Sequence, residues 1–321
     1  MSKRILKQLI AMGLFCSCVC ADAEAFKVSI IKVVEHEAIN AVVDGIKDEL
    51  KGRGVKYDIE TCQADPALAY QIATKFVNDK TDVIVAVGTT PAQCAFGFAK
   101  LGKPKAKLGQ AKLVFSSVTE PTDIAKSFAN CNTTGVSNFV SLKPQLELFK
   151  KLQPKLKKLG IIYNSGESNS ISIIKKLEKE CEAQGITLVK QSIQQSADIP
   201  QAITKLKTNV DAVFITNDNT ALSGIPCIVQ ACDKVKIPVY VSDTDQVAKG
   251  CLAALGPNQY EIGRQTGRII KRIQNGEDIN EISVEYPDTM ELFLNKEKAK
   301  ELDITVPADV LKEAKCPDGK K

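Results

Sequence analysis

Short polar segments follow several apolar runs of the sequence, and they hold side chains suited to binding a small charged ligand. Glu35 and His36 follow the first such run, and Asp243 follows one in the second half of the chain. Hydrogen bonds between such side chains and a charged ligand contribute about 1.5–3 kcal/mol each. The candidate ligand-binding residues are Glu35, His36, Thr89, Thr90, Ser117, Thr119, Asn138, Asn164, Asn169, Asn217, Asp218 and Asp243.

One group of candidates is suited to a carboxylate. The pair Thr90-Pro91 fits a helix N-cap followed by proline at the first helical position, an arrangement that leaves free backbone N–H groups at the helix start. Hydroxyl groups of Thr89, Ser117 and Thr119 follow neighbouring apolar runs. A helix start with hydroxyl groups beside it is a ready site for an anion. The sequence therefore predicts a carboxylate pocket in the first half of the chain.

A second group of candidates is suited to an ammonium group. Asp218 and Asp243 lie in the polar segments of the second half, and either carboxylate can accept from a cation. An anion pocket facing a cation pocket suits a zwitterion. The alternative is that these side chains only cap helices and form turns, as Ser, Thr, Asn and Asp often do. For His36 alone, a structural hydrogen-bonding role is the commoner one.

Signatures of catalysis, cofactors and metals are absent from the sequence. It holds no G-x-G-x-x-G, Walker, G-x-S-x-G or H-E-x-x-H motif, and its single histidine, His36, excludes a multi-histidine metal site. The 43 basic and 38 acidic residues are spread along the chain, whereas nucleic-acid binders concentrate their basic residues. We expect a binding protein without catalytic residues, cofactor, metal or nucleic-acid partner.

The elements that must position these residues occur twice. Lys27–Ile31 is typical of a buried strand, a helix is expected near Ala38–Leu50, and Gly54 ends it. The same order recurs from Lys158 through a helix to Ala183 and on to Gly185, with the same overall spacing. Short apolar strands that alternate with helices indicate parallel sheets covered on both faces. The 321 residues are about twice a usual domain, so we predict two similar doubly wound α/β lobes.

Further strands and helices complete each half. Expected strands are Val55–Thr61, Asp82–Val87, Lys112–Phe115, a run from Ile186, Asp211–Ile215, Ile237–Val241, Cys251–Leu255, Ile282–Tyr286 and Leu292–Leu294; expected helices are Ala67–Asn78, Ile199–Leu206 and Tyr260–Gln274. The late elements allow the chain to cross between lobes more than once. We expect lobe one to comprise 26–138 and about 259–284, and lobe two 139–258 and about 285–317. A multi-strand hinge then leaves a cleft at the carboxyl ends of the strands, where open α/β sheets bind ligands.

The first 25 residues have the three-part layout of a secretory signal peptide. Lys3, Arg4 and Lys7 precede an apolar run from Leu9 to Cys20, and A-x-A patterns end at Ala25. The apolar run, about 12 residues, is too short to span a bilayer. An uncleaved anchor, or lipid attachment at Cys16, Cys18 or Cys20, is the alternative. We expect an exported protein, periplasmic or at the cell surface, whose eight remaining cysteines have no spacing that specifies disulfides.

Short stretches in a fixed order carry a family resemblance. They include Val33–His36, Thr90–Gln93, Val114–Thr119, Gly160–Asn164, Thr216–Thr220, Ser242-Asp243, Ala253–Gly256 and Gly263–Gly267. Together they resemble the substrate-binding proteins of ABC importers, in particular the tryptophan/tyrosine-type family with the type I periplasmic-binding-protein fold. The resemblance runs from about Lys27 to Leu311. Glu120 departs from the pattern, because aspartate is expected before the proline.

The resemblance implies a monomer that holds a ligand between lobes closing about a three-strand hinge, and then docks on a membrane permease with a separate ATPase. It implies a carboxylate held by Thr89, Thr90, Ser117 and Thr119, and an ammonium met by an acid of lobe two. The ligand expected is a small polar molecule, an amino acid. The resemblance to the tryptophan/tyrosine-type family more specifically suggests an aromatic amino acid. Two other functions stay open: a ligand-sensing receptor protein and an exported enzyme on a similar fold. Candidate rings for stacking on an aromatic ligand are Phe96, Phe139 and Tyr163.

Overall fold

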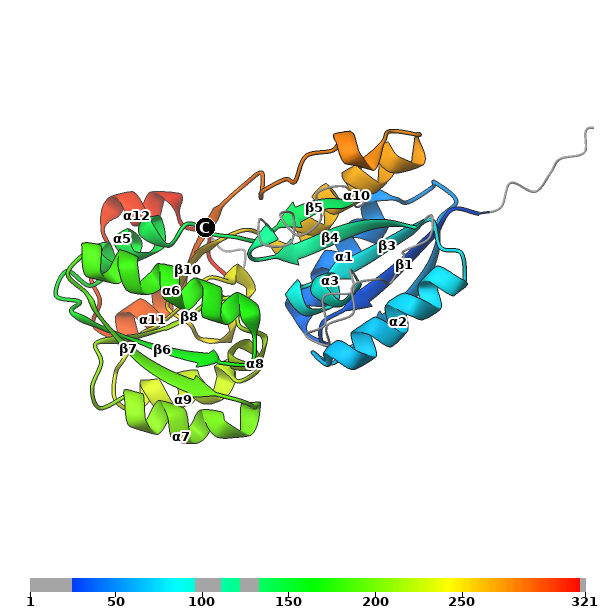
Figure 1. The fold of residues 1–321 in the computed structure, drawn as a ribbon. Helices are drawn as coiled ribbons and strands as arrows, with labels where there is room; N and C mark the ends of the chain where they lie inside the picture. The colour runs from blue at the N-terminus through cyan, green and yellow to red at the C-terminus, as the bar shows by residue number, and fades with distance from the viewer. Residues whose placement is uncertain (1–24, 96–110, 122–132, 318–321) are drawn as a thin grey trace, which may run out of the picture.

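The computed structural model describes residues 25–95, 111–121 and 133–317, and these form two α/β lobes (Figure 1). Each lobe has one sheet with helices on both faces. The strands of the first sheet are all parallel and lie in the order β2-β1-β3-β4-β5. Their bounds are Lys27–Lys32 (β1), Lys56–Thr61 (β2), Val83–Val87 (β3), Lys112–Val118 (β4) and Thr133–Ser137 (β5).

The central strand of lobe one shows why these residues form a parallel sheet. Every residue of β3 is buried, and the run is Val-Ile-Val-Ala-Val. Its odd residues, such as Val85, pack toward helices α1 (Glu37–Glu49) and α10 (Gln259–Gln274). Its even residues, Ile84 and Ala86, pack with α2 (Pro66–Asn78) and with α3 (Thr89–Ala95). A strand covered on both faces needs continuous apolar character instead of alternation.

Helix α10 joins lobe one from far along the chain, and glycines let it approach α1 closely. A Cβ atom placed on Gly263 would lie 2.1 Å from the carbonyl oxygen of Val42. One placed on Gly45 would lie 2.1 Å from the carbonyl oxygen of Tyr260. No real Cβ atom fits such a gap, so both positions require glycine. This contact explains the glycine at the start of the Gly263–Gly267 motif.

The sheet of lobe two has the order β11-β10-β9-β8-β6-β7, and only β11 is antiparallel to its neighbour. The strands are Lys158–Asn164 (β6), Thr187–Ile193 (β7), Ala212–Ile215 (β8), Val239–Val241 (β9), Ala253–Gly256 (β10) and Glu291–Leu294 (β11). The helices are Leu142–Leu152 (α5), Ser168–Ala183 (α6), Ile199–Leu206 (α7), Asn219–Ser223 (α8), Ile225–Asp233 (α9), Lys296–Glu301 (α11) and Ala308–Glu313 (α12). Short 3₁₀ helices lie at Ser196–Asp198 (η1), Thr244–Lys249 (η2) and Ile279–Glu281 (η3).

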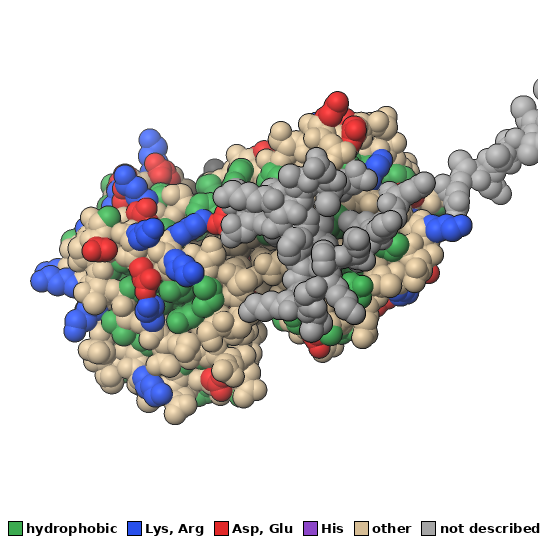
Figure 2. Space-filling model, in the orientation of Figure 1, with side chains coloured by type: hydrophobic (Ala, Val, Ile, Leu, Met, Phe, Trp, Pro, Cys, Tyr) green, Lys and Arg blue, Asp and Glu red, His purple; other side chains and the backbone are tan. Residues whose placement is uncertain are grey.

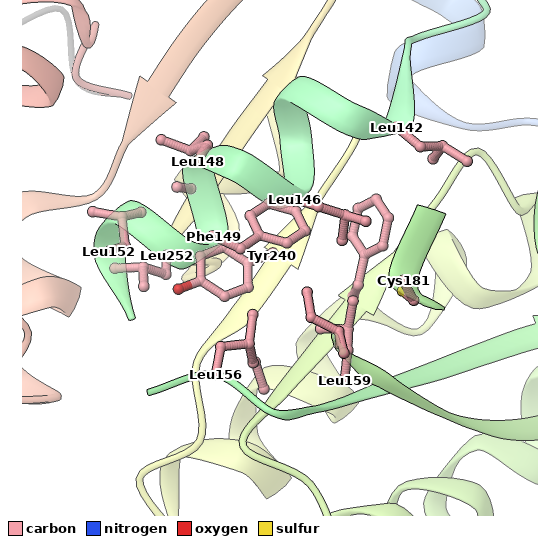
Figure 3. Packing of buried hydrophobic residues seen from close by; sticks show 14 of the residues in the cluster. Leu142, Leu146, Leu148, Phe149, Leu152, Leu156, Leu159, Cys181, Tyr240 and Leu252 are labelled. Carbon is pink, nitrogen blue, oxygen red and sulfur yellow. The ribbon is translucent and has the colours of Figure 1, made fainter. Parts of the chain in front are cut away.

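Aromatic rings lie within one hydrophobic core of lobe two (Figure 3). The ring of Phe149 in α5 stacks on Tyr240 of β9 at a centroid distance of 4.1 Å. It meets Phe214 of β8 edge-on at 5.0 Å. The hydroxyl of Tyr240 donates to Gln153 Oε1 at 2.9 Å, so burying this tyrosine leaves no unpaired polar group.

The described chain passes between the lobes three times. The passages join β5 to α5, β10 to α10, and η3 to β11. On the third passage the backbone of Glu285 makes two hydrogen bonds to β5, each at 2.9 Å. Its N–H donates to Gly135 O, and its carbonyl accepts from Ser137 N. We propose that the lobe boundaries at 138/139, about 258/259 and about 284/285 fall in these passages.

The expected fold class, two doubly wound α/β lobes joined by several chain segments, is confirmed by the two sheets. The segment Ile282–Tyr286, expected as a strand, pairs only through a single bridge between Glu285 and Val136. The third passage between the lobes uses this segment. The lysine-rich stretch 103–112 lies outside the described residues except for Ala111 and Lys112, and Lys112 begins β4.

Charges on the surface of lobe two are mixed in sign. On the face drawn in Figure 2, Lys and Arg side chains lie among Asp and Glu side chains over this lobe. Lys155, Lys157, Lys175 and Lys179 are exposed, as solvated surface lysines are. Within the described ranges no helix has both the length and the apolar character to cross a bilayer.

Candidate ligand-binding site

A cavity lies between the lobes, at the carboxyl ends of the strands, and its empty space, open solvent included, is about 480 Å³. Both lobes contribute to its walls. The lining residues are His36, Ala38, Ile39, Gly88, Thr89, Ser117, Thr119, Asn138, Asn169, Asn217, Asn219, Leu222, Asp243 and Gln259.

Two special backbone positions shape the wall from lobe one. Gly88 has φ +100°, and a Cβ there would lie 2.8 Å from Val33 Cγ1, so only glycine fits. The carbonyl of Gly88 accepts from Ala92 N at 3.3 Å, which makes Gly88 the residue that caps α3. The helix therefore begins two residues earlier than the Thr90-Pro91 pair predicts. Thr89, its first residue, lines the cavity, and Thr90 does not.

Ser117 sits on a β-bulge near the end of β4. The register between β4 and β5 shifts between Ser116 and Val118, and Ser117 has φ +55°. A bulge inserts one residue into a strand and redirects its side chain, and such features recur beside functional sites. Here the bulge places the Ser117 hydroxyl in the cavity. It donates to Gln259 Oε1 at 3.0 Å and accepts from Asn138 Nδ2 at 2.9 Å.

His36 caps helix α1 at the opposite side of this wall. Its Nδ1 accepts from the backbone N–H of Ala38 at 3.3 Å. Burial, with a further contribution from the nearby Lys249 charge, holds the pKa of His36 below its ordinary value. The ring is therefore neutral, with its remaining proton on Nε2 available as a donor.

Asp243 is the only carboxylate among the cavity-lining residues of the described chain. It follows β9, is 1% exposed, and accepts from Asp245 N and Gln246 Nε2, each at 3.1 Å. No residue in the described ranges forms an ion pair with it. Burial raises the pKa of Asp243, because a carboxylate out of water lacks its hydration. An ammonium group in the cavity would supply the missing positive charge.

A second buried carboxylate, Glu167, holds amide side chains in the cavity without entering it. Its oxygens accept from the backbone N–H and Nδ2 of Asn219 at 3.1 and 2.7 Å. They also accept from Thr220 N and Oγ1, at 3.0 and 2.8 Å. Asn169 Nδ2 donates to Glu167 at 3.3 Å and to Asn217 O at 2.8 Å. Glu167 therefore orients Asn169 and Asn219.

Eight of the twelve sequence-predicted residues line the cavity: His36, Thr89, Ser117, Thr119, Asn138, Asn169, Asn217 and Asp243. Glu35 is exposed outside it, where it accepts from Thr61 Oγ1 and pairs with Lys32. Asn164 lies in a strand-end network, with its Nδ2 bonded to Thr220 Oγ1 at 2.8 Å.

Asp218 also lies outside the cavity, because lobe two uses its carboxylate internally. It is fully buried and caps α8 by accepting from Ala221 N at 2.7 Å. It accepts as well from Ser170 Oγ at 2.7 Å and Asn164 N at 2.5 Å. Burial, with the nearby Glu167 carboxylate, raises the pKa of Asp218 to about 6. Of the two acids proposed for an ammonium, only Asp243 reaches the cavity.

Sequence reasoning missed six lining residues. Asn219 stands in the polar run after β8, so that run gave a usable signal. Gln259 lies one residue before the expected helix at Tyr260, and it does not directly follow a predicted strand, so the strand-end pattern could not identify it. The remaining four, which are apolar or lack a side chain, have no sequence signal of their own: Ala38, Ile39, Gly88 and Leu222.

The lobes touch each other across the cleft. Lys249 of lobe two pairs with Glu37 of lobe one at 2.7 Å, and Lys176 pairs with Glu120. Ser168 Oγ donates to Gln93 Oε1 at 3.2 Å. These contacts join the two lobes directly, so the structure has the lobes closed together.

None of the described residues forms a metal-type cluster or a disulfide. No group of three or more His, Cys, Asp or Glu side chains converges in the described ranges. The cysteines that the structure describes are free thiols. Two α/β lobes, three connecting passages and a polar cleft between them define a ligand-binding protein of the two-lobe type.

Comparisons with known proteins give the family. Residues 27–316 match the family model described as ABC transporter substrate binding protein, and the chain belongs to that family. A curated relative, the Tyrosine-binding protein of Clostridioides difficile (strain R20291), is 29% identical over 305 residues, which are 92% of this chain and 86% of the relative.

Two solved structures are similar along most of the chain. The ABC domain in complex with L-Trp from Streptococcus pneumonia has a TM-score of 0.81 at 28% identity, covering 91% of this chain and 99% of that one. The ligand-free, open structure of a substrate binding protein with adhesive properties from Clostridium difficile has a TM-score of 0.67 at 29% identity, with the same coverage. The lobe arrangement therefore matches the ligand complex more closely than the open structure.

Proposed function

We propose that this protein binds a free amino acid in the cleft between its lobes and delivers it to the permease of an ABC importer. The observation that carries the proposal is Asp243, a buried carboxylate that lines the cavity and has no ion-pair partner in the described chain. A buried charge without a partner is costly, so a cationic ligand group at this position would stabilise the site.

The opposite wall suits the carboxylate of the same ligand. Thr89 and Thr119 bring hydroxyl donors from the ends of β3 and β4 on lobe one, beside Ser117, whose own proton goes to Gln259 Oε1. Hydroxyl donors there and a carboxylate acceptor at Asp243 match the two charges of a zwitterion. Because the groups sit on different lobes, one bound amino acid would hold the lobes together.

Support for an aromatic side chain comes from the relatives, which include a tyrosine-binding protein and an L-Trp complex. Ala38, Ile39 and Leu222 give the cavity an aliphatic wall on which a ring can pack. Phe139 and Tyr163, the candidate stacking rings that the structure describes, do not line the cavity. We therefore propose tyrosine or tryptophan as the leading ligands, packed against aliphatic side chains.

Export and import complete the proposal. The leader expected at residues 1–25 lies outside the described residues, and its basic, apolar and A-x-A segments support secretion. Membership of the family supports a permease and a separate ATPase as partners. Closure of two lobes around a ligand is a standard switch, and it gives the permease a way to recognise the loaded protein.

A thermal-shift panel of the free amino acids tests the ligand class. An amino acid at 100 times its dissociation constant stabilises the protein by about 2.7 kcal/mol. We expect tyrosine or tryptophan to give the largest rise in melting temperature. Asp243→Asn should abolish that rise, whereas Asp309→Asn, at an exposed ion pair with Lys151, should leave it unchanged. A panel with no shift for any amino acid would contradict the proposed ligand class.

A further inference from the structure

Three side chains of the cavity form a single hydrogen-bonded chain. Asn138 Nδ2 donates to Ser117 Oγ at 2.9 Å, and Ser117 Oγ donates to Gln259 Oε1 at 3.0 Å. Asn138, Ser117 and Gln259 are 7%, 5% and 4% exposed, and all three line the cavity. They come from the first passage between lobes, the bulge of β4 and the start of α10.

The chain has a direction, because a serine hydroxyl has only one proton to donate. Ser117 accepts from Asn138, so its proton goes to Gln259. This leaves one amide group free at each end. Asn138 Oδ1 is buried without any hydrogen-bond partner in the described structure. The Nε2 group of Gln259 forms no hydrogen bond with any residue in the described ranges. One end of the chain is thus a free acceptor and the other a free donor.

We infer that the Asn138–Ser117–Gln259 chain orients the ligand, with Asn138 Oδ1 accepting from its ammonium group and Gln259 Nε2 donating to its carboxylate. The inference rests on the proposed amino-acid ligand and goes further, because it names two residues that fix which end of the zwitterion faces which wall. The acceptor end works together with the Asp243 carboxylate. The donor end extends the hydroxyl wall of Thr89 and Thr119.

A purely structural role for these side chains explains less. It accounts for the two bonds to Ser117 and leaves both outer amide groups without protein partners, and one of them, Asn138 Oδ1, is buried. An unsatisfied buried polar group costs about 1–3 kcal/mol. A zwitterion satisfies both groups at once, and ammonium and carboxylate are the two ligand groups that match their polarity.

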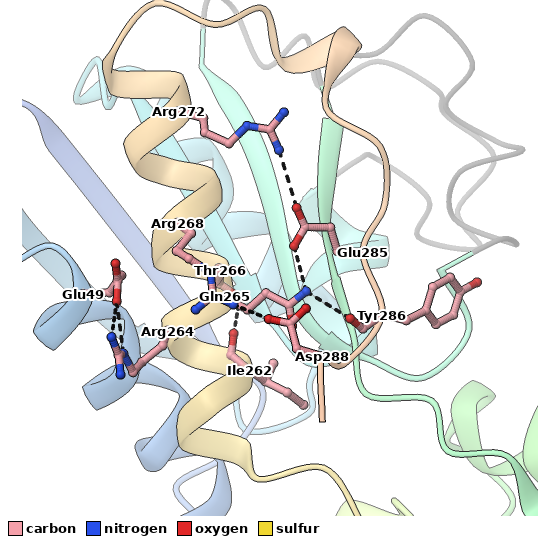
Figure 4. A network of polar contacts seen from close by, with 10 residues as sticks. All are labelled: Glu49, Ile262, Arg264, Gln265, Thr266, Arg268, Arg272, Glu285, Tyr286 and Asp288. Atoms are coloured by element: carbon pink, nitrogen blue, oxygen red, sulfur yellow. Dashed lines mark hydrogen bonds and ion pairs between the residues drawn. The ribbon is translucent and has the colours of Figure 1, made fainter. Parts of the chain in front are cut away.

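The chain also connects the ligand to the hinge. The carbonyl of Asn138 accepts from Asn217 Nδ2, on lobe two, at 3.2 Å. Gln259 begins α10 directly after the second passage between lobes. Further along α10, Gln265 Nε2 donates to Glu285 Oε2 at 2.7 Å and to Tyr286 O at 3.0 Å on the third passage (Figure 4). A ligand that completes both ends of the chain therefore fastens the passages in the closed arrangement.

Titration calorimetry with three probes tests the inference: L-tyrosine, tyramine, which lacks the carboxylate, and 3-(4-hydroxyphenyl)propionate, which lacks the amine. Gln259→Glu keeps the acceptor for Ser117 and replaces the free donor by a negative oxygen. We expect it to weaken tyrosine at least about tenfold and to change tyramine by less than about threefold. Gln274→Glu, at the far end of the same helix beside Arg53, is the control for added charge and should change neither.

Asn138→Leu tests the other end with the opposite signature. It removes the acceptor, so tyrosine and tyramine should weaken by the same factor of about tenfold, while the amine-free acid is unchanged. Equal weakening of tyrosine and tyramine by Gln259→Glu would overturn the inference, because a hinge or folding defect affects every ligand alike. Melting temperatures of the unliganded variants separate such a defect from lost recognition.

Failure of the proposed function gives a different result. In that case the wild-type protein binds none of the three probes and no amino acid in the panel. Where L-tryptophan binds more tightly than tyrosine, the matched probes are tryptamine and 3-(indol-3-yl)propionate. Wild-type binding of an amino acid together with variants that keep its ligand selectivity would reject the orienting chain and leave the proposed function standing.

Discussion

In the proposed function, Asp243 is the residue on which ligand recognition depends most. Its side chain combines burial, a place in the cavity and the absence of an ion-pair partner in the described chain. The sequence made Asp218 an equal candidate for binding an ammonium group. Its side chain instead caps a helix and accepts from a serine hydroxyl and a backbone N–H. The two residues occupy the same kind of strand end, so only the packed structure separates the site carboxylate from the structural one.

Ligand affinity should fall as the pH is lowered through the raised pKa of Asp243. Burial raises the pKa of Asp243 above its ordinary 3.8, and that of the neighbouring Asp245 to about 6. An ammonium group binds the ionised carboxylate, so the complex holds fewer protons than the free protein, and affinity is lost as pH drops through the raised values. Calorimetry across this range measures the slope. A flat profile in wild type would contradict this assignment.

Glu167→Gln should reduce both stability and affinity. The substitution removes a charge that accepts from Asn219 and Thr220, and puts an NH₂ group opposite donors. Loss of hydrogen bonds to a charged group costs about 1.5–3 kcal/mol of unfolding free energy. Affinity should fall as well, because Asn169 and Asn219 lose their orientation. Urea melts and calorimetry give the two quantities.

The control is Glu178→Gln, which breaks an exposed pair with Lys190. Exposed ion pairs contribute about 0–1 kcal/mol, so this variant should unfold and bind almost as wild type does. Equal effects of the two substitutions would show that Glu167 is an ordinary surface acid.

Helix α10 is the element that holds the hinge together. It packs on α1 through glycines, and its Thr266 hydroxyl forms a hydrogen bond with the Ser116 hydroxyl of β4 at 2.7 Å. Its Gln265 side chain donates to Glu285 on the third passage. Its first residue, Gln259, lines the cavity. This one helix thus contacts the lobe-one core, the cavity and two of the connecting segments.

Gly263→Ala should destabilise the protein by at least about 1–3 kcal/mol. The added methyl would lie 2.1 Å from the Val42 carbonyl, so the two helices must separate, and overpacking of this kind has that cost. Glu261→Ala, at an exposed position of the same helix, should change the free energy of unfolding by less than about 0.5 kcal/mol. Equal denaturant midpoints for Gly263→Ala and wild type would refute the close helix contact.

Hydrophobic pattern predicted most elements of the sheets because each strand is short, apolar and bounded by turns. The runs at Lys27, Asp82 and Lys158 are strands within a residue or two of the expected bounds. Strand β5, Thr-Thr-Gly-Val-Ser, was not predicted because its polar composition hides a burial that the neighbouring α10 and Glu285 provide. Ile282–Tyr286 was expected as a strand, but it meets the edge strand β5 only through a single bridge at Glu285 before the chain crosses to lobe two.

Within the candidate site, strand ends gave eight lining residues because polar side chains at parallel strand ends converge. Gln259 could not be found this way, because it reaches the cavity from a helix that returns to lobe one late in the chain. The hydrogen-bond partners of the site side chains also cannot be predicted from the sequence. The amide groups of Asn138 and Gln259 that lack a partner are identified from three-dimensional contacts alone.

At the scale of the whole molecule, the contacts between the lobes within the described residues are mostly polar and partly exposed. They include the pairs Lys249–Glu37 and Lys176–Glu120 and the bond between Ser168 and Gln93. Exposed contacts of this kind contribute about 0–1 kcal/mol each. In the proposed function, the bound ligand therefore supplies much of the free energy of closure.

Lys249→Ala should weaken ligand binding only about two- to fivefold, because it removes one surface ion pair from the closed form. The free energy of unfolding of the unliganded protein should stay the same. Small-angle scattering should show the same contraction on saturation with ligand as in wild type. A loss of affinity above about a hundredfold would mean that the pair, and not the ligand, drives closure.

A crystal structure with the amino acid that raises the melting temperature most tests the central claim directly. We expect one amino acid in the interlobe cleft, with its ammonium within hydrogen-bonding distance of Asp243 and its carboxylate beside Thr89 and Thr119. An empty cleft at saturating ligand, or a carboxylate turned toward Asp243, would contradict the account.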